Sequence, residues 1–289
     1  MASAAARRLP QARRLPPHAY FLVSAVFHYL GPAFAVLLFA SLAPLGVAWL
    51  RIASAALVFA VWRRPWRYFL TLSPAERRTV VALGAVLAAM NCCFYEAIAR
   101  LPLGTVGAIE FLGPILLAAF GLSSRRNLAA LIAAAAGVYL LTSFRLTHEP
   151  LGYLFAFANC GLFLLYIVLG HRIAATGGRG GIDRLGAAML VASIAAAPIG
   201  FSDALPAFGS PLLLAAAIGV GISSSVIPYV CDQLAMARLP RASFALLLSL
   251  LPATATVIGV LVLGQIPAPI EVAGIALVVA GVALHRSQG

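Results

Sequence analysis

Arg51 and Glu110 are the two ionisable residues that lie deepest inside long apolar runs of this chain. A charged side chain at membrane depth costs at least a few kcal/mol, so each is a functional candidate. Each lies seven residues into its run from the same side, roughly 10 Å deep at the 1.5 Å rise of a helix. Two interpretations are open: the residues form a structural ion pair, or they bind the carboxylate and the ammonium group of a zwitterion.

Uncharged polar residues stand in the same kind of run. His28 lies near the middle of its run beside Tyr29, shortly before Gly31-Pro32, where we expect the helix to break. A neutral histidine can hydrogen-bond within a helix bundle, carry a proton or contact a ligand. Asn91 and Ser224, the centre of three consecutive serines, either line a wet cavity or let helices approach closely.

Two acidic residues lie nearer the ends of their runs, each with an arginine following. Glu96 precedes Arg100 by four residues, the spacing of a salt bridge along one helix face. Asp232 precedes Arg238 near the end of another run, so it is predicted either to form a gating ion pair or to anchor the helix end.

The elements that position these residues are predicted to be membrane-spanning helices. Apolar residues make up 63% of the chain and charged residues 10%, against about 45 to 50% and about 25% in soluble domains. The runs are continuously apolar, whereas the strands of a membrane barrel alternate. The fold class expected is all-α, with ten helices at 19–40, 44–61, 79–99, 103–122, 127–144, 151–170, 185–201, 211–237, 241–264 and 268–284.

Arginine carries the whole net charge of +12, because the sequence contains no lysine. If residues 1–18 form a cytoplasmic arm, only Arg100 and Arg145 fall in outside loops. The inside segments hold Arg7, Arg8, Arg13, Arg14, Arg63, Arg64, Arg67, Arg77, Arg78, Arg125, Arg126, Arg172, Arg179, Arg184, Arg238, Arg241 and Arg286. The positive-inside rule therefore predicts a multi-pass protein of a bacterial inner membrane with both termini in the cytoplasm. No nucleic-acid partner is expected, since the arginines lack the pattern of an RNA-binding module.

The chain repeats itself at an offset of 138 residues: the segment 99–102 (ARLP) recurs at 237–240, and Pro114 recurs as Pro252. The first ARLP follows the third expected helix on the outside and the second follows the eighth on the inside, so the second copy is inverted. Many secondary transporters are built from such inverted repeats. We predict one five-helix repeat over 19–144 and another over 151–285, with Pro114 and Pro252 breaking their helices beside a substrate pocket.

Four segments carry a resemblance to a known family. They are MNCCFYEAIARLPLGTVGAIEFLGPILLAAF, SSSVIPYVCDQLAMARLPRASFALLLSLLPA, WLRIASAALVF and LGQIPAPIEVAGIALVVAG. Together they resemble the drug/metabolite transporter superfamily in its EamA-repeat branch, most closely the bacterial threonine and homoserine exporters, from about Tyr20 to Leu284. The resemblance implies export of amino acids or related small polar metabolites by proton antiport, and an acidic residue at the position of Asp232.

The chain departs from that family's pattern at three positions. The resemblance implies glutamates where this chain has Leu251 and Gln265, and a small polar residue where it has Glu96. Glu110 is then the remaining deep acid, so a proton-coupled cycle is expected to load and release its proton mainly there. His28 is the next candidate.

Other functions remain compatible with these features. One is an exporter of lipophilic drugs, lipids or other metabolites within the same superfamily, and another is a passive channel. An intramembrane enzyme is disfavoured because the sequence has no HExxH, paired catalytic Asp or GxSxG motif. Transport driven by nucleotide hydrolysis is disfavoured because there is no Walker-type loop, and neither cofactor nor metal is expected. The expected partners are a small polar metabolite, protons and the lipid bilayer. The sequence leaves the substrate, the coupling ion and the oligomeric state open, a homodimer included.

Overall fold

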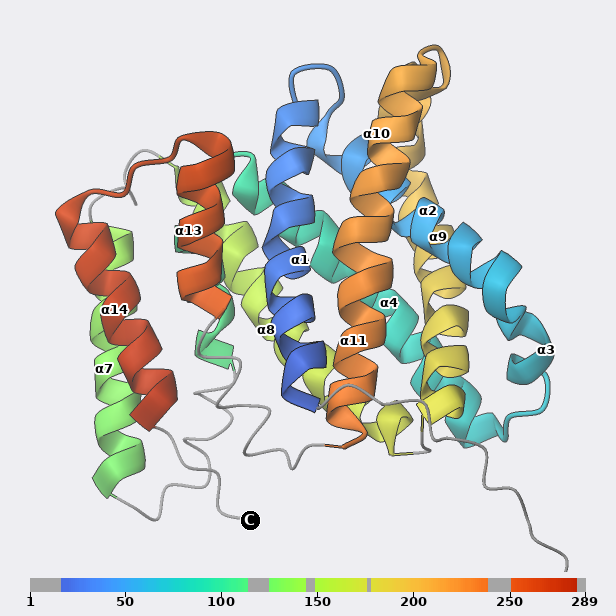
Figure 1. Cartoon of the computed structure of the whole chain (residues 1–289), viewed down its shortest axis with the longest axis horizontal. Helices are drawn as coiled ribbons and strands as arrows, with labels where there is room; N and C mark the ends of the chain where they lie inside the picture. Colours follow the sequence, from blue (N-terminus) through green and yellow to red (C-terminus); the bar gives the residue numbers. More distant parts are fainter. Residues whose placement is uncertain (1–16, 114–124, 144–148, 176–177, 239–250, 285–289) are drawn as a thin grey trace, which may run out of the picture.

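The computed structural model describes residues 17–113, 125–143, 149–175, 178–238 and 251–284, and every element within these ranges is helical (Figure 1). In chain order they are α1 (Pro17–Leu38), α2 (Pro44–Arg63), α3 (Pro65–Phe69), α4 (Pro74–Ile98), α5 (Leu103–Glu110), α7 (Arg125–Ser143), α8 (Pro150–Ala174), α9 (Gly178–Phe208), α10 (Pro211–Gly221), the π-helix η1 (Ile222–Val226), α11 (Ile227–Met236), α13 (Leu251–Leu263) and α14 (Pro269–Leu284).

Six of the described helices are long and apolar enough to cross a membrane. They are α1, α2, α4, α8, α9 and the continuous helix formed by α10, η1 and α11. Shorter apolar stretches lie in α7, α13 and α14. The all-helical membrane architecture predicted from the apolar runs is thereby confirmed, and the count of ten spans in two inverted repeats stays a prediction.

Several helices extend beyond the predicted spans, because hydropathy marks the part of a helix that can lie in lipid rather than its ends. α4 begins at Pro74 instead of 79, since Ser73 and Glu76 form a capping box in which each side chain bonds the other residue's backbone N–H. α9 runs from Gly178 to Phe208 instead of 185–201 and contains two prolines.

The helix break expected at Gly31-Pro32 does not occur, so that prediction was wrong. α1 continues through Pro32 to Leu38. A proline inside a helix removes one backbone donor, and here the rest of the helix still forms. Gly31 serves packing instead, because a Cβ atom at this position would overlap the side chain and backbone of Ser224 in η1.

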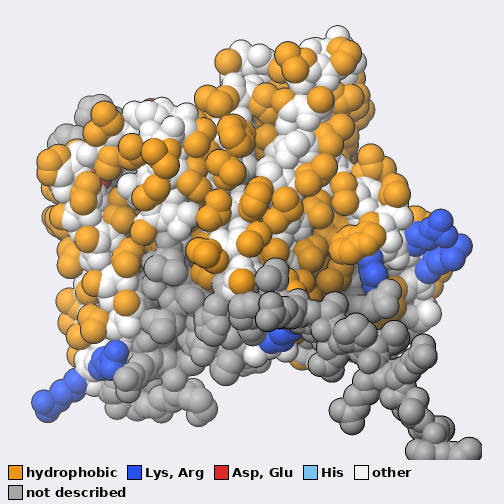
Figure 2. Space-filling view, in the orientation of Figure 1, with side chains coloured by type: hydrophobic (Ala, Val, Ile, Leu, Met, Phe, Trp, Pro, Cys, Tyr) orange, Lys and Arg blue, Asp and Glu red, His pale blue; other side chains and the backbone are white. Residues whose placement is uncertain are grey.

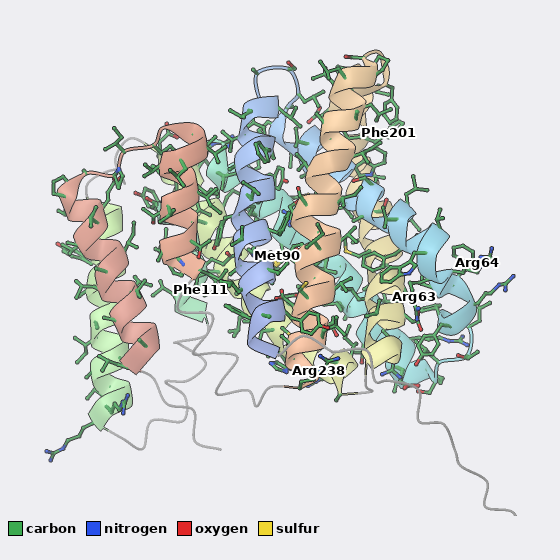
Figure 3. All side chains as sticks on the ribbon, in the orientation of Figure 1. Arg63, Arg64, Met90, Phe111, Phe201 and Arg238 are labelled. Carbon is green, nitrogen blue, oxygen red and sulfur yellow. The ribbon has the colours of Figure 1, made fainter. Side chains whose placement is uncertain are left out.

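Arginines link the helix ends at one end of the bundle, the lower end in Figure 1, which we term the arginine end. Arg63 at the end of α2 forms an ion pair of 2.7 Å with Asp183 early in α9. The neighbouring Arg184 pairs with Glu76 in the first turn of α4. Figure 3 places Arg63 and Arg64 on the right-hand side and Arg238 below α11, and Figure 2 shows arginine side chains along the lower and right-hand edges.

The outward faces of the helices carry large apolar side chains, which cover most of the view in Figure 2. Among the most exposed are Leu212, Leu261 and Val61, at 80%, 77% and 76%. Such exposure would be costly in water, and it suits contact with lipid chains. The interior is polar in places, with Arg51, Glu110, Asn159 and Asp232 all buried.

Close packing of α4 on α9 depends on Gly84. A Cβ atom there would lie 2.6 Å from Val191 Cβ and 2.7 Å from the Ala188 carbonyl oxygen. We expect Gly84→Ala to lower the free energy of unfolding by about 1–3 kcal/mol through overpacking. The matched control is Gly219→Ala in α10, where a Cβ would meet nothing within 4 Å and helix propensity should add about 0.5–1 kcal/mol. Thermal unfolding in detergent measures both, and equal melting temperatures would contradict the prediction.

Candidate functional site

A small cavity lies in the middle of the bundle, and we term it the central cavity. Its volume of about 10 Å³ is enough for about one water molecule. Six helices contribute to its wall: α1, α2, α4, α5, α8 and α11. The lining residues are His28, Arg51, Met90, Asn91, Phe94, Glu110, Asn159 and Tyr229. Figure 3 labels Met90 at mid-height of the bundle, well above Arg238.

Glu110 is the acidic group of the central cavity. It is the last residue of α5 and only 2% exposed. The Tyr29 hydroxyl donates a hydrogen bond of 3.0 Å to Oε2, and Asn159 Nδ2 donates one of 3.0 Å to Oε1. Gly107, one turn before Glu110, leaves room for Tyr29, since a Cβ there would lie 3.1 Å from the tyrosine hydroxyl. The carboxyl group is therefore held by uncharged donors.

Arg51 is the basic group of the central cavity, and it is turned toward η1. Its Nε donates to Ser225 Oγ at 2.7 Å and its Nη2 donates to the Ser224 carbonyl oxygen at 2.8 Å. The guanidinium carbon lies 5.5 Å from the centre of the Tyr95 ring, within the range of a cation–π contact. Arg51 is thus anchored without an acidic partner.

The Ser224 carbonyl is available to Arg51 because of Pro228. In an α-helix this carbonyl would accept a bond from the N–H of residue 228, which proline lacks. The chain forms the π-helix η1 at this point, and the Ile227 N–H bonds to the Ile222 oxygen five residues back. Short π-helical turns inside α-helices are rare and frequent at functional sites. The serine run that the sequence singled out therefore contributes a backbone carbonyl and the hydroxyl of Ser225.

Arg51 and Glu110 do not form an ion pair, although both lie in the described part of the chain and line the same cavity. The structural ion pair, one of the two interpretations of the sequence, is therefore not formed. Two oppositely charged side chains instead line the same cavity, and each is held by neutral groups. This arrangement has the charges that a zwitterion would require.

The remaining predicted residues of the cavity are His28 and Asn91. The His28 ring lies edge-on to Tyr29 and Phe163, with ring centres 5.3 Å and 6.3 Å apart. Asn91 Nδ2 donates to the Leu87 carbonyl oxygen at 2.7 Å. Within the described residues, the oxygens Oδ1 of Asn91 and of Asn159 are buried and have no hydrogen-bond partner.

An ion pair between Asp232 and Arg238, one of the two alternatives that the sequence left open, is not formed within the described residues. Asp232 points inward and accepts hydrogen bonds from Ser24 Oγ at 2.5 Å and Tyr166 Oη at 3.4 Å. Arg238 follows the end of α11 and lies over the Tyr20 ring, 5.2 Å from its centre. Six residues along a helix turn the side chain to another face, which explains the separation.

Neither Glu96 nor Pro252 is among the residues that line the central cavity. Glu96 pairs with Arg100 at the end of α4, the helix-end contact that their spacing predicts. Pro252 is the second residue of α13, so it stands at the start of the described helix. Pro114 lies outside the described residues.

A second, larger hollow of about 370 Å³ lies near the ends of α4 and α13. Its wall includes Arg100, Thr105 and Gln265. Gln265, where the family resemblance implies an acid, caps the start of α5 by accepting a 3.0 Å hydrogen bond from the Leu103 N–H. α5 then leads from this hollow to Glu110.

Sequence reasoning missed four residues that the structure brings to these contacts. They are Ser24, Asn159, Tyr166 and Tyr229. Asn159 had a usable signal, because an amide inside an apolar run is as unusual as the other polar groups considered. The tyrosines had none, since a tyrosine in such a run is also an ordinary packing residue.

Comparisons with known proteins agree on one family. Residues 150–286 match the EamA-like transporter family. The chain is 30% identical over 276 residues to "Threonine/homoserine exporter RhtA" of Escherichia coli (strain K12), covering 93% of this chain and 91% of the relative. The exporter of the same name from Salmonella typhimurium (strain LT2) gives the same values. A crystal structure 19% identical in sequence has a TM-score of 0.60 over 92% of this chain and 97% of its own, so the fold is shared.

The anchoring of Arg51 can be tested with two neighbouring serines. Ser225→Ala removes the acceptor of a buried charged donor and should lower the free energy of unfolding by about 1–3 kcal/mol. The control Ser223→Ala removes a hydroxyl that bonds the Val220 carbonyl of its own helix, and it should change stability by less than about 0.5 kcal/mol. Melting curves that coincide for the two variants would argue against this anchoring.

Proposed function

The chain belongs to the EamA-like transporter family, and from this premise we propose that it is a secondary active exporter of amino acids of the threonine and homoserine type. Its curated relatives are named as threonine/homoserine exporters, and its long apolar helices make it a multi-pass membrane protein. Export, rather than intramembrane catalysis, is what these relatives support.

The observation that carries the proposal is the pair of unpaired charges in the central cavity. A buried charge without a counter-charge is costly, and neither Arg51 nor Glu110 has one within ion-pair distance among the described residues. An amino acid supplies both counter-charges at once: its carboxylate binds Arg51 and its ammonium group binds Glu110. A lipophilic cation would satisfy Glu110 alone.

The cavity is too small for an amino acid in this conformation, so binding requires the helices to move apart. One turn from the cavity residue Tyr229 toward the arginine end, Asp232 joins α11 to α1 through Ser24 and to α8 through Tyr166. The rings of Tyr166 and Tyr229, 5.4 Å apart, lie in the same layer. We assign Asp232 to gating: opening toward the arginine end would break its two hydrogen bonds.

Ten spans in two inverted repeats suit such a cycle, because inverted halves can rock around a site between them. The contacts of the two repeated arginines support the inversion. Arg238, after α11, lies over Tyr20 at the start of α1. Arg100, after α4, lies over Phe155 near the start of α8, with its ring centre 5.6 Å away. The two repeated arginines thus lie beside the starts of the first and sixth expected helices, as the inverted arrangement requires.

Proton antiport follows if a proton and the substrate ammonium group compete for Glu110. A protonated Glu110 offers no charge to the ammonium group, so threonine affinity should fall as the pH falls. Glu110→Gln cannot titrate and should lose most of this pH dependence. The loss of one charge-assisted hydrogen bond should also reduce transport by at least about tenfold.

Purified protein in liposomes, assayed for labelled threonine uptake and binding across a pH series, measures both effects. Glu96→Gln is the matched control, because it makes the same change in an acid that lies outside the central cavity and pairs with Arg100. Equal pH dependence in wild type and Glu110→Gln would assign coupling to another group, with His28 the first to examine.

Orientation in the membrane is proposed from the arginine end, which we place in the cytoplasm of a bacterial cell with both termini, following the positive-inside rule. Reporter fusions after Gln288 and within the loop at His148 should then report opposite sides of the inner membrane. Reporters on the same side would contradict both the orientation and the ten-span count.

A further inference from the structure

We infer that Asn91 selects solutes that carry a hydroxyl group on the side chain, a specificity that rests on the proposed amino-acid export. The observation behind it is a buried hydrogen-bond acceptor in the wall of the central cavity. Asn91 is 1% exposed, it lines the cavity, and its Oδ1 has no partner among the described residues.

The orientation of the Asn91 amide is determined by its own helix. Nδ2 donates to the Leu87 carbonyl oxygen, one turn earlier in α4. The amide atom that faces the Leu87 carbonyl must be the nitrogen, because only the nitrogen can donate a hydrogen bond. The amide atom on the other side is therefore the oxygen. The oxygen that remains is a pure acceptor, and a buried acceptor without a donor is unfavourable. A solute that brings an O–H or N–H group to this point removes that penalty.

Arg51, Glu110 and Asn159 are assigned to the backbone groups of an amino acid by the proposed function. Asn159 donates a hydrogen bond to Glu110, so we assign its free oxygen to the substrate ammonium group, beside the Glu110 carboxylate. Arg51 receives the substrate carboxylate. Asn91 contacts neither charged residue through a hydrogen bond, which leaves it to contact the substrate side chain.

Its position on α4 supports this assignment. Asn91 lies about one helical turn from Tyr95, whose ring is under the Arg51 guanidinium. The acceptor is therefore near the group that would hold the carboxylate. Met90 and Phe94 flank Asn91 in the cavity wall and offer apolar surface. A hydroxyl and a methyl group on one short side chain would both find contacts at this wall.

An unpaired acceptor of this kind disfavours substrates whose side chains cannot donate a hydrogen bond. Threonine and valine have nearly the same shape, and valine cannot donate a hydrogen bond from its side chain. A site built to bond a substrate hydroxyl rejects the analogue without it far more strongly than an apolar pocket distinguishes two shapes. The wild-type protein should therefore prefer threonine over valine by at least about tenfold.

The test measures uptake of labelled threonine, valine and alanine by purified protein in liposomes. Asn91→Leu keeps the size of the side chain and removes the acceptor, so the threonine-to-valine ratio should fall about tenfold or more toward unity while alanine uptake persists. Asn91→Ala repeats the test without any bulk in the cavity. Ala89→Leu, on an exposed position of α4, is the matched control and should keep the wild-type ratio.

The outcomes separate the two proposals. If the wild-type protein transports none of the three amino acids, the proposed function fails. If it transports threonine and valine equally, or if both Asn91 variants keep the wild-type ratio, the specificity inference is overturned while the function stands. Loss of alanine uptake in both variants would also overturn it, as would a fall in the ratio with Tyr229→Phe instead, which would assign recognition to the Tyr229 hydroxyl.

Discussion

The hydrogen bond from Arg51 to the Ser224 carbonyl joins two groups that would each be unfavourable alone. Within a membrane there is no water to bond a carbonyl that lacks its helical donor, and Pro228 leaves Ser224 in that state. A buried guanidinium has the opposite need, since it has donors and no acceptor. Arg51 and η1 satisfy each other at 2.8 Å, and this contact fixes α2 against the continuous helix of α10, η1 and α11. The position of the basic group follows from it.

The acidic group, Glu110, is held by a different set of helices from Arg51, and this separation keeps the two charges apart. Tyr29 of α1 and Asn159 of α8 hold Glu110 by donors that carry no charge. Arg51 is held by the π-helix η1, which precedes α11. Neither anchor requires the other, so the two charges can face a shared space without collapsing into a pair. A zwitterion entering that space would add an ion pair to each charged group, which now has hydrogen bonds to neutral groups only.

Close contact between the helices depends on small residues at a few points. Gly31 of α1 meets Ser224, and Gly221 meets Ser54 and the Arg51 carbonyl, so the backbones of three helices come together around η1. Gly107 likewise lets α5 approach Tyr29 of α1, because a Cβ atom there would crowd the tyrosine hydroxyl. Small residues at helix contacts are common in membranes, where packing and hydrogen bonds replace the hydrophobic effect between helices. Here they bring the hydrogen-bonding groups of the site within reach.

Hydropathy and charge by themselves determined that the chain is a helical membrane protein and that Arg51, Glu110, His28 and Asn91 are unusual within it, because those properties are local and need only the cost of polar groups in lipid. Tertiary structure decided the partners. Arg51 and Ser225 are 174 residues apart, and Tyr29 and Glu110 are 81 apart. No period along one helix could reveal such contacts. The same reason explains why two of the ion pairs that the sequence allowed, Arg51 with Glu110 and Asp232 with Arg238, are not formed: packing turned Arg51 to η1 and Asp232 to Ser24 and Tyr166.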